Sequence, residues 1–334
     1  MNLKERIQGF VQLGIYLEDS FFTQCSDEIH ESMVRNPWFT KSSINKAILA
    51  WSGQLNLETL HAWLNPYRLT SVSTPKRVLV LMAGNIPLVG FHDLLSVVIS
   101  GHKAVVKLSS TDSVLIPLLV NELVRINPLF EEYIEFVDHV RGKKFDSVIA
   151  TGRDQSAQYF EYYFKDLKKI IRKNRRSIAV LDGAESVSEL NGLAHDVFLY
   201  FGLGCRNVSK LFLPYGYDLN NLFEAFYCFN KIIEHKKYAN NYDYNKAIFL
   251  MGKNKIIENG FLLLKEDSSH LSPVAMLYYE YYDDISIVER FIKDNVDSLQ
   301  CVVSKDKISF GSTQNPSLWD YADGVDTIEF LKEV

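Results

Sequence analysis

The sequence lacks the features that mark disulfide-bonded, membrane and nucleic-acid-binding proteins. Its four cysteines are widely separated among 334 residues and form no CxxC pair, so neither a zinc site nor a disulfide framework is expected. No uncharged apolar stretch reaches the ~18 residues of a membrane span, and the first residues lack the apolar core of a signal peptide. The net charge of -5 offers no basic field for nucleic acid. We therefore expect a cytoplasmic protein without a metal site, a membrane span or a nucleic-acid partner.

Repeats, low-complexity linkers and the GxGxxG fingerprint of standard dinucleotide-binding folds are also missing. The remaining composition is that of a globular protein, with 47% hydrophobic and 23% charged residues, and the length allows about two domains. Aromatic residues are abundant, with 18 tyrosines and 21 phenylalanines, so most of them are expected in cores, and a surplus would suit an apolar substrate channel.

Apolar runs of strand length alternate with segments of helical periodicity from residue 77 onward. Such alternation predicts right-handed βαβ units and parallel sheets buried on both faces. The expected strands are 77–82, 104–108, 134–137, 147–150, 177–181, 211–213, 247–251, 275–279 and 299–304. The expected helices are 27–35, 42–51, 88–100, 114–126, 154–171, 187–200 and 222–235.

Polar residues follow three of these strands. Asn85, Lys107 and the pair Thr151–Gly152 all come at a predicted carboxyl end. Ligands of parallel sheets bind at those ends, so the pattern indicates a nucleotide-type site despite the missing glycine fingerprint.

Cys205 stands on a loop that contains Gly202 and Gly204 and leads into a short apolar strand. The glycines allow a sharp turn, and a thiolate there would attack a carbonyl or thioester while a loop N–H held the oxyanion. The alternative is that Cys205 is a small core residue, as most free cysteines are.

Four motifs, taken together and in order, resemble the acyl-CoA reductase (LuxC-type) branch of the aldehyde dehydrogenase superfamily. They are GNIP at 84–87, KLSS at 107–110, GLGCRNVSK at 202–210 and DYADGVD at 320–326. The resemblance covers roughly residues 75 to 330. It implies an α/β, aldehyde dehydrogenase-like fold of two three-layer αβα domains with mostly parallel sheets. It also implies a nicotinamide cofactor and the reduction of an acyl thioester to an aldehyde.

The expected domains follow from this resemblance. Residues 1–70 form a helical lead-in packed on the first domain, and 71–176 form the cofactor-binding domain. Residues 177–308 form the catalytic domain, and 309–334 return to the cofactor domain as a C-terminal segment.

The catalytic residues that the resemblance implies are Cys205 and Asn85. Cys205 would attack acyl-CoA and hold the acyl group as a thioester until hydride reduces it. Asn85 matches the asparagine whose amide, with the N–H of the cysteine, stabilises the oxyanion in this superfamily. The alternative for Asn85 is an ordinary turn residue.

The resemblance assigns six residues to cofactor binding: Lys107, Ser109, Ser110, Thr151, Gly152 and Ser269. Lys107 matches a lysine at the adenosine ribose, and Ser110 stands where many NAD-dependent relatives have a ribose-binding glutamate. Without that carboxylate a 2′-phosphate meets no repulsion, which predicts NADPH, with NADH as a second candidate. Ser269 replaces a family glutamate at the nicotinamide ribose. The alternatives are a surface lysine for Lys107 and simple helix capping at Thr151.

The glutamate base of oxidising aldehyde dehydrogenases aligns with Val180, which cannot activate water. With a shifted register, Asp182 or Glu185 would take that role. His195, Asp196 and His270 are further candidates for proton transfer, although a structural role is favoured for His195.

Two charged features complete the candidates. Arg206 would lower the pKa of the Cys205 thiol or point away from it. The basic cluster at 168–176 would meet cofactor phosphates or, more simply, form a solvated face.

Two other functions stay open: an oxidising or acyl-phosphate-using enzyme of the same superfamily, and a non-catalytic acyl-binding subunit. Acyl-CoA is the expected substrate. Either a homo-oligomer or a partner protein that delivers the acyl group is a further expectation.

Overall fold

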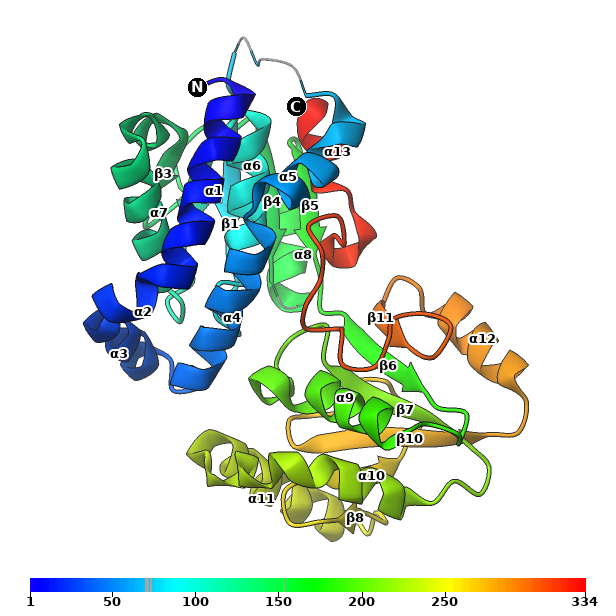
Figure 1. Ribbon diagram of the computed structural model, residues 1–334. Coiled ribbons are helices and arrows are strands. Elements are labelled where there is room, and N and C mark those ends of the chain that lie inside the picture. Colours follow the sequence, from blue (N-terminus) through cyan, green and yellow to red (C-terminus); the bar gives the residue numbers. More distant parts are fainter. Residues whose placement is uncertain (70–71, 73, 153) are drawn as a thin grey trace. The chain divides into compact units, whose positions relative to one another are not determined.

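The computed structural model describes residues 1–69, 72, 74–152 and 154–334, and they form two units (Figure 1). The first unit consists of Met1–Asn174 and Ser317–Val334, and the second of Arg175–Pro316. The boundary predicted between residues 70 and 71 lies outside the described residues. Residues 309–316, assigned from the sequence to the C-terminal segment, stay in the second unit. The buried carboxylate of Asp196 holds them there by accepting hydrogen bonds from the N–H groups of Gly311 and Thr313.

The first unit is built on a parallel sheet in the order β3-β2-β1-β4-β5. Its strands are β1 Arg77–Leu81, β2 Lys103–Lys107, β3 Ile134–Phe136, β4 Ser147–Thr151 and β5 Lys168–Arg172. The helices α6 Phe91–Ser100, α7 Leu115–Ile126 and α8 Asp154–Tyr163 connect them. The central strands are nearly continuous apolar runs because helices cover both faces of the sheet.

Five helices precede this sheet and pack on it. They are α1 Leu3–Asp19, α2 Phe21–Gln24, α3 Ser26–Arg35, α4 Lys41–Gln54 and α5 Leu57–Leu64. α1 contacts α4, α5, α6 and α7, and its apolar side chains join the same core as the sheet. Arg6 is buried in this contact, where its Nε donates to the carbonyl of Ile99 at 3.0 Å.

The end of the chain returns to the first unit through α13 Thr327–Lys332, which packs on α6. The Oη of Tyr321, in the DYADGVD motif, accepts from the Trp63 indole at 2.7 Å, and Tyr67 Oη donates to Asp326 at 2.6 Å. The motif that contributed to the family resemblance therefore fastens the C-terminal segment to α5 and the short 3-10 helix after it.

The second unit has a six-stranded sheet in the order β11-β6-β7-β10-β9-β8, parallel except for the β8–β9 pair. Its strands are β6 Arg176–Val180, β7 Val208–Pro214, β8 Ile257–Glu258, β9 Leu263–Glu266, β10 Met276–Tyr282 and β11 Leu299–Val303. Its helices are α9 Val187–Phe198, α10 Leu219–Phe226, α11 Lys236–Met251 and α12 Ile285–Asp294. The predicted α/β class with mostly parallel sheets is confirmed.

Two predicted elements are wrong. The apolar run 247–251 is the last part of α11 rather than a strand, because a short apolar run fits either structure and this one continues a long helix. The helix predicted to reach residue 171 ends at Tyr163, and 168–172 form the edge strand β5. Within the part of the chain that the structure describes, no helix combines the length and apolarity needed to cross a bilayer.

Candidate active site

The loop that carries Cys205 has an unusual backbone. Tyr200, Phe201 and Gly202 all adopt left-handed conformations, with φ of 53°, 59° and 72°. Glycine takes this conformation freely, whereas each aromatic residue pays on the order of 1–3 kcal/mol for it. Such strain persists only where the surrounding structure imposes it, and it is concentrated at functional sites.

Asn207 imposes this conformation. It is 1% exposed, and its Nδ2 donates to the carbonyls of Asp196 at 3.0 Å and Leu199 at 2.8 Å, at the end of α9. Its Oδ1 accepts from the N–H of Gly204 at 2.9 Å. The Asn207 side-chain amide thus provides hydrogen-bond partners for the last carbonyls of α9 and for the backbone N–H directly before Cys205.

Two further contacts hold the loop. Ser177 Oγ, at the start of β6, donates to the carbonyl of Cys205 at 2.9 Å. The ring of Phe201 lies against His235, with centroids 4.3 Å apart. Reasoning from the sequence did not single out Asn207 or Ser177. The available signal was an asparagine two residues after the cysteine at a loop-to-strand junction, a usual place for side-chain capping of backbone groups.

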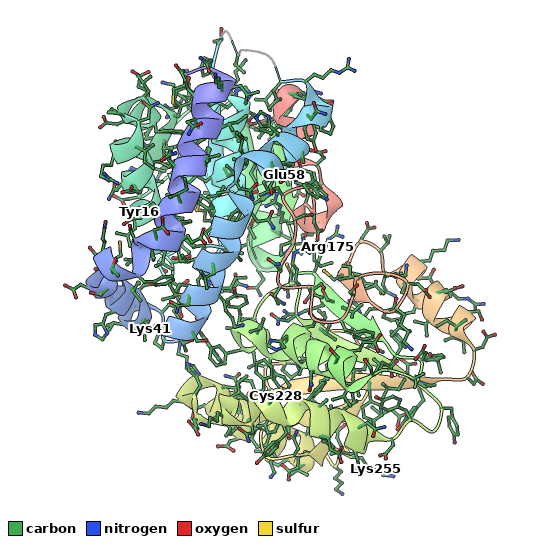
Figure 2. All side chains as sticks on the ribbon, viewed as in Figure 1. Tyr16, Lys41, Glu58, Arg175, Cys228 and Lys255 are labelled. Atoms are coloured by element: carbon green, nitrogen blue, oxygen red, sulfur yellow. The ribbon has the colours of Figure 1, made fainter. Side chains whose placement is uncertain are left out.

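The four cysteines differ in their surroundings. Cys25 and Cys301 are buried, Cys205 is half-buried, and Cys228 is exposed in the 3-10 helix Tyr227–Glu234 (Figure 2). Burial raises the pKa of both the Cys25 and the Cys228 thiols. Arg206 Nη1 donates to Cys301 Sγ at 3.4 Å, so at least one edge of that guanidinium is turned to the buried cysteine.

The residues considered for a general base stand at the end of β6 and in the turn that follows it. β6 and β7 run in parallel, with Ser177 beside Val208 and Val180 beside Phe212. Cys205 precedes the start of β7, whereas Val180 ends β6. Ser177 and Asp182 are five residues apart along β6 and the turn after it, which is on the order of 15 Å of extended chain. The alignment of Val180 with the catalytic glutamate stays a prediction, and the Val180 side chain packs against the cluster of Ile178, Phe212, Val288 and Leu299.

Asp182 and Glu185 instead shape the turn after β6. Glu185 accepts from the N–H of Asp182, and Lys305 Nζ binds both oxygens of Asp182 at 2.9 and 2.8 Å. The lysine lowers the pKa of Asp182, while burial raises that of Glu185.

His195 and Asp196 have structural surroundings. The His195 ring packs edge-on against Phe229 at 5.1 Å. Asp196 is fully buried and accepts three hydrogen bonds from Gly311 and Thr313. Burial raises the pKa of Asp196, and these donors oppose the rise. Both its oxygens are occupied, so Asp196 anchors a loop rather than moving a proton.

Ser269 and His270 lie on a loop bound to β7. Lys210, 0% exposed, donates from Nζ to the carbonyls of Asp267 and Ser268 and to Glu280 Oε2 at 2.6 Å. Ser209 Oγ donates to the carbonyl of His270 at 2.6 Å. Burial, then the positive charges of Lys210 and Arg176, lower the pKa of His270. His270 is therefore neutral near pH 7.

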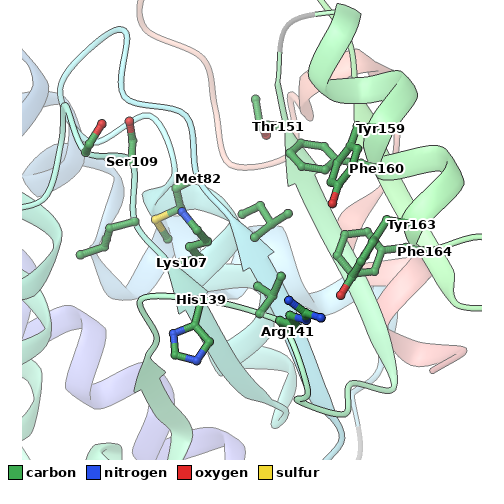
Figure 3. Close-up of a pocket in the computed structure, with 14 residues that line it drawn as sticks. Met82, Lys107, Ser109, His139, Arg141, Thr151, Tyr159, Phe160, Tyr163 and Phe164 are labelled. Carbon is green, nitrogen blue, oxygen red and sulfur yellow. The ribbon is translucent and has the colours of Figure 1, made fainter.

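The first unit contains a cavity of about 760 Å³ at the carboxyl ends of β1, β2 and β4 (Figure 3). It is lined by Leu81, Met82, Lys107, Leu108, Ser109, Ser110, His139, Val140, Arg141, Thr151, Tyr159, Phe160, Tyr163 and Phe164. Three of these side chains are basic and none is acidic. The aromatic residues of α8 form one wall, opposite Lys107 and Met82, and the rings of Tyr159 and Tyr163 stack with centroids 5.7 Å apart.

The structure brings four of the six expected cofactor contacts together, since Lys107, Ser109, Ser110 and Thr151 all line this cavity. Gly152 has another local role. A Cβ at that position would lie 2.9 Å from Ser156 Cβ, so glycine permits the close packing of α8 on the end of β4. Ser269 belongs to the second unit, and its Oγ accepts from the N–H of Leu271 at 3.2 Å.

Asn85 is exposed on the turn that follows β1. The preceding carbonyl, that of Gly84, accepts from Thr111 Oγ1 at 2.9 Å and from Asn36 Nδ2 at 3.1 Å. The turn is therefore attached to the loop after β2. Asn85 belongs to the first unit and Cys205 to the second, and their pairing over one oxyanion stays a prediction. Among the described residues no three His, Cys, Asp or Glu side chains gather as a metal site would require.

Comparisons with known proteins give a consistent result. The family model described as "Acyl-CoA reductase (LuxC)" matches residues 43–229. A curated relative, the long-chain acyl-protein thioester reductase of Aliivibrio fischeri, is 24% identical over 232 residues, covering 64% of this chain and 47% of the relative. The chain thus spans about half the length of the curated relative that it matches.

Solved structures of aldehyde dehydrogenases are similar in fold. The NAD-dependent benzaldehyde dehydrogenase of Corynebacterium glutamicum has a TM-score of 0.67 and 14% identity, over 92% of this chain and 77% of that one. The NADP-dependent glyceraldehyde-3-phosphate dehydrogenase of Bacillus halodurans C-125 has a TM-score of 0.65 and 12% identity, over 92% and 75%. These likenesses confirm the aldehyde dehydrogenase-like fold expected from the sequence.

Proposed function

The chain belongs to the acyl-CoA reductase (LuxC) family, and from this premise we propose that it reduces an acyl thioester to an aldehyde with NADPH, through an S-acyl intermediate on Cys205. The family match over residues 43–229 confirms the resemblance and covers three of the four sequence motifs, those at 84–87, 107–110 and 202–210. The observation that carries the proposal is the combination, in one chain, of a half-buried cysteine on a strained loop with a basic cavity at the strand ends of the other unit.

The chemistry that this arrangement supports has two stages. Cys205, as the thiolate, adds to the acyl carbon, and the bond from that carbon to the donor sulfur breaks, so the donor leaves as a thiolate that takes a proton from water and becomes a free thiol. A nicotinamide cofactor held by the cavity residues Lys107, Ser109, Ser110 and Thr151 would supply the hydride that reduces the resulting thioester. The bond from carbon to Cys205 sulfur would then break, which releases the aldehyde and restores the Cys205 thiolate. Negative charge develops on one oxygen in both stages, and the Asn85 amide is the proposed donor to it.

The lining of the cavity favours NADPH over NADH. Lys107 comes from the end of β2, and His139 and Arg141 come from the loop after β3 (Figure 3). A 2′-phosphate adds negative charge that these groups attract, and no carboxylate among the lining residues repels it. Ser110 contributes to this lining at the position where a glutamate would bind both ribose hydroxyls of NADH.

Two acyl donors are compatible with the proposed site. Acyl-CoA is the donor expected from the family description. An acyl-protein thioester is the second candidate, because the curated relative bears that substrate in its name. Both donors present the same thioester carbon to Cys205, so the carrier that docks outside the site distinguishes them. A partner protein that delivers the acyl group is part of this second candidate.

The test measures NADPH oxidation and free thiol release with a series of acyl-CoA chain lengths and with the same acyl groups on a carrier protein. We expect one thiol released per NADPH oxidised. Cys205→Ala should abolish turnover, whereas Cys228→Ala, the matched control, should leave it unchanged. Wild-type-like turnover by the Cys205 variant, or absence of turnover with every donor, would overturn the proposed function.

A further inference from the structure

Asp112 is a buried carboxylate that the proposed reaction does not use. It is 3% exposed and lies on the loop after β2, three residues beyond Ser109. Its Oδ2 accepts from the N–H of Leu88 at 2.9 Å. Its Oδ1 is buried and has no hydrogen-bond partner among the described residues. A buried carboxylate with one unsatisfied oxygen lowers the stability of the fold. We therefore expect the hydrogen bond accepted by the other oxygen to have a function.

The partner of Asp112 is strained. Leu88 is 1% exposed and has a φ of 61°, which is rare for a branched residue and costs on the order of 1–3 kcal/mol. Leu88 ends the turn 84–88, which contains Asn85 and leads into α6. Its N–H is buried and requires an acceptor.

The turn 84–88 and the loop 109–112 are joined at both ends. Thr111 Oγ1 donates to the carbonyl of Gly84 at one end, and the Leu88 N–H donates to Asp112 at the other. The two segments lie so close that a Cβ on Gly84 would be 2.6 Å from both Ser109 Oγ and Thr111 Oγ1. The same loop contributes Ser109 and Ser110 to the cavity.

We propose that Asp112 is a positioning residue, which holds the strained end of the turn 84–88 and so sets the direction of the Asn85 amide relative to the cavity. This inference rests on the proposed function for the part played by Asn85. The Asp112 carboxylate acts through the Leu88 N–H and touches no reacting atom. Because the loop 109–112 keeps its own turn, with the Asp112 N–H donating to the Ser109 carbonyl at 3.2 Å, removal of the side chain should disturb Asn85 more than Ser109 and Ser110.

The first experiment needs no enzymatic activity. Amide hydrogen exchange is measured on a peptide covering 83–90 in the full-length wild type, Asp112→Ala and Asp112→Asn, with the exposed Asp166→Asn as a control. We expect Asp112→Ala to exchange at least tenfold faster at Leu88. Asp112→Asn should match the wild type, because its amide oxygen still accepts that hydrogen bond. Equal exchange in all four proteins overturns the inference.

The second experiment separates positioning from general destabilisation. Asp112→Ala should lower kcat at least tenfold while the Kd of NADPH changes less than threefold, and Asp112→Asn should restore kcat to within about twofold. In an Asn85→Ala background, Asp112→Ala should cause no further loss of kcat. Additive losses of kcat in the double variant overturn the inference. A tenfold loss of kcat in Asp112→Asn also overturns it, and this variant decides the question even where Asp112→Ala does not fold. A wild type without turnover refutes the proposed function instead, and the exchange result then decides this inference alone.

Discussion

Asp112→Asn should change how the stability of the protein depends on pH. Burial raises the pKa of Asp112 from its ordinary value of 3.8 to about 7, opposed by the hydrogen bond from the Leu88 N–H. Close to Asp112 in the chain, Ser113 accepts a hydrogen bond at 3.0 Å from Arg35 of α3, and Arg35 also pairs with Glu31. No such cation binds the carboxylate oxygens of Asp112 among the described contacts.

The sign follows from proton binding. Between pH 4 and pH 7 the unfolded chain has lost the Asp112 proton while the folded chain retains it, so unfolding releases a proton and stability falls as the pH rises. Above about pH 7 both states are ionised and the loss is complete. The interval from 3.8 to about 7, at roughly 1.4 kcal/mol for each pH unit, corresponds to roughly 4 kcal/mol. Asparagine has no proton to lose, so its stability lacks this slope.

The assay is thermal unfolding of the wild type and Asp112→Asn from pH 4 to pH 8.5. The difference in unfolding free energy, variant minus wild type, should be smallest near pH 4, rise by roughly 4 kcal/mol and level off above about pH 7. For a unit of this size that rise corresponds to on the order of 10 °C in the unfolding midpoint of the first unit. Asp166→Asn serves as the exposed control and should show no slope. A difference that stays constant with pH would refute the raised pKa assigned to Asp112.

Three other substitutions test the remaining contacts. Asn207→Ala should destabilise the second unit by about 2–4 kcal/mol, because it leaves several buried backbone groups unpaired, whereas the exposed Asn220→Ala should change stability by less than about 0.5 kcal/mol in the same denaturant titration. Arg141→Ala should raise the KM for NADPH about tenfold or more and leave the KM for NADH unchanged. Equal increases in KM for both cofactors would contradict a contact between Arg141 and the 2′-phosphate. Lys210→Met removes two hydrogen bonds from Lys210 Nζ to carbonyls of the loop 267–270, so amide hydrogen exchange in that loop should become faster. An unchanged exchange rate would show that other contacts hold the loop.

The elements that bear on the proposed cofactor site could be predicted because their signals are local. β1, β2 and β4 are apolar runs buried on both faces, and such runs identify central strands of a parallel sheet. The residues that follow parallel strands meet at one edge, so Lys107 and Thr151 were expected together, and they do line one cavity. The predictions from local sequence pattern were wrong at 168–172 and 247–251. An apolar or mixed run there fits a helix and a strand equally well, so the packing against neighbouring elements decides which one forms.

The sequence by itself determined the family, the strand ends and the cysteine on its glycine loop, since each is recorded in adjacent residues. Tertiary structure alone decided which side chains hold that loop and the Asn85 turn. Asn207 holds the cysteine loop because the end of α9 lies beside its side chain. Asp112 holds the Asn85 turn because the N–H of Leu88, a residue with a strained backbone, lies 2.9 Å from its carboxylate. The strand register likewise decided that Ser177 lies beside the start of β7 and Val180 beside Phe212. Hydrogen bonds and burial depend on distances between residues remote in the chain, and those distances exist only once the sheets have formed.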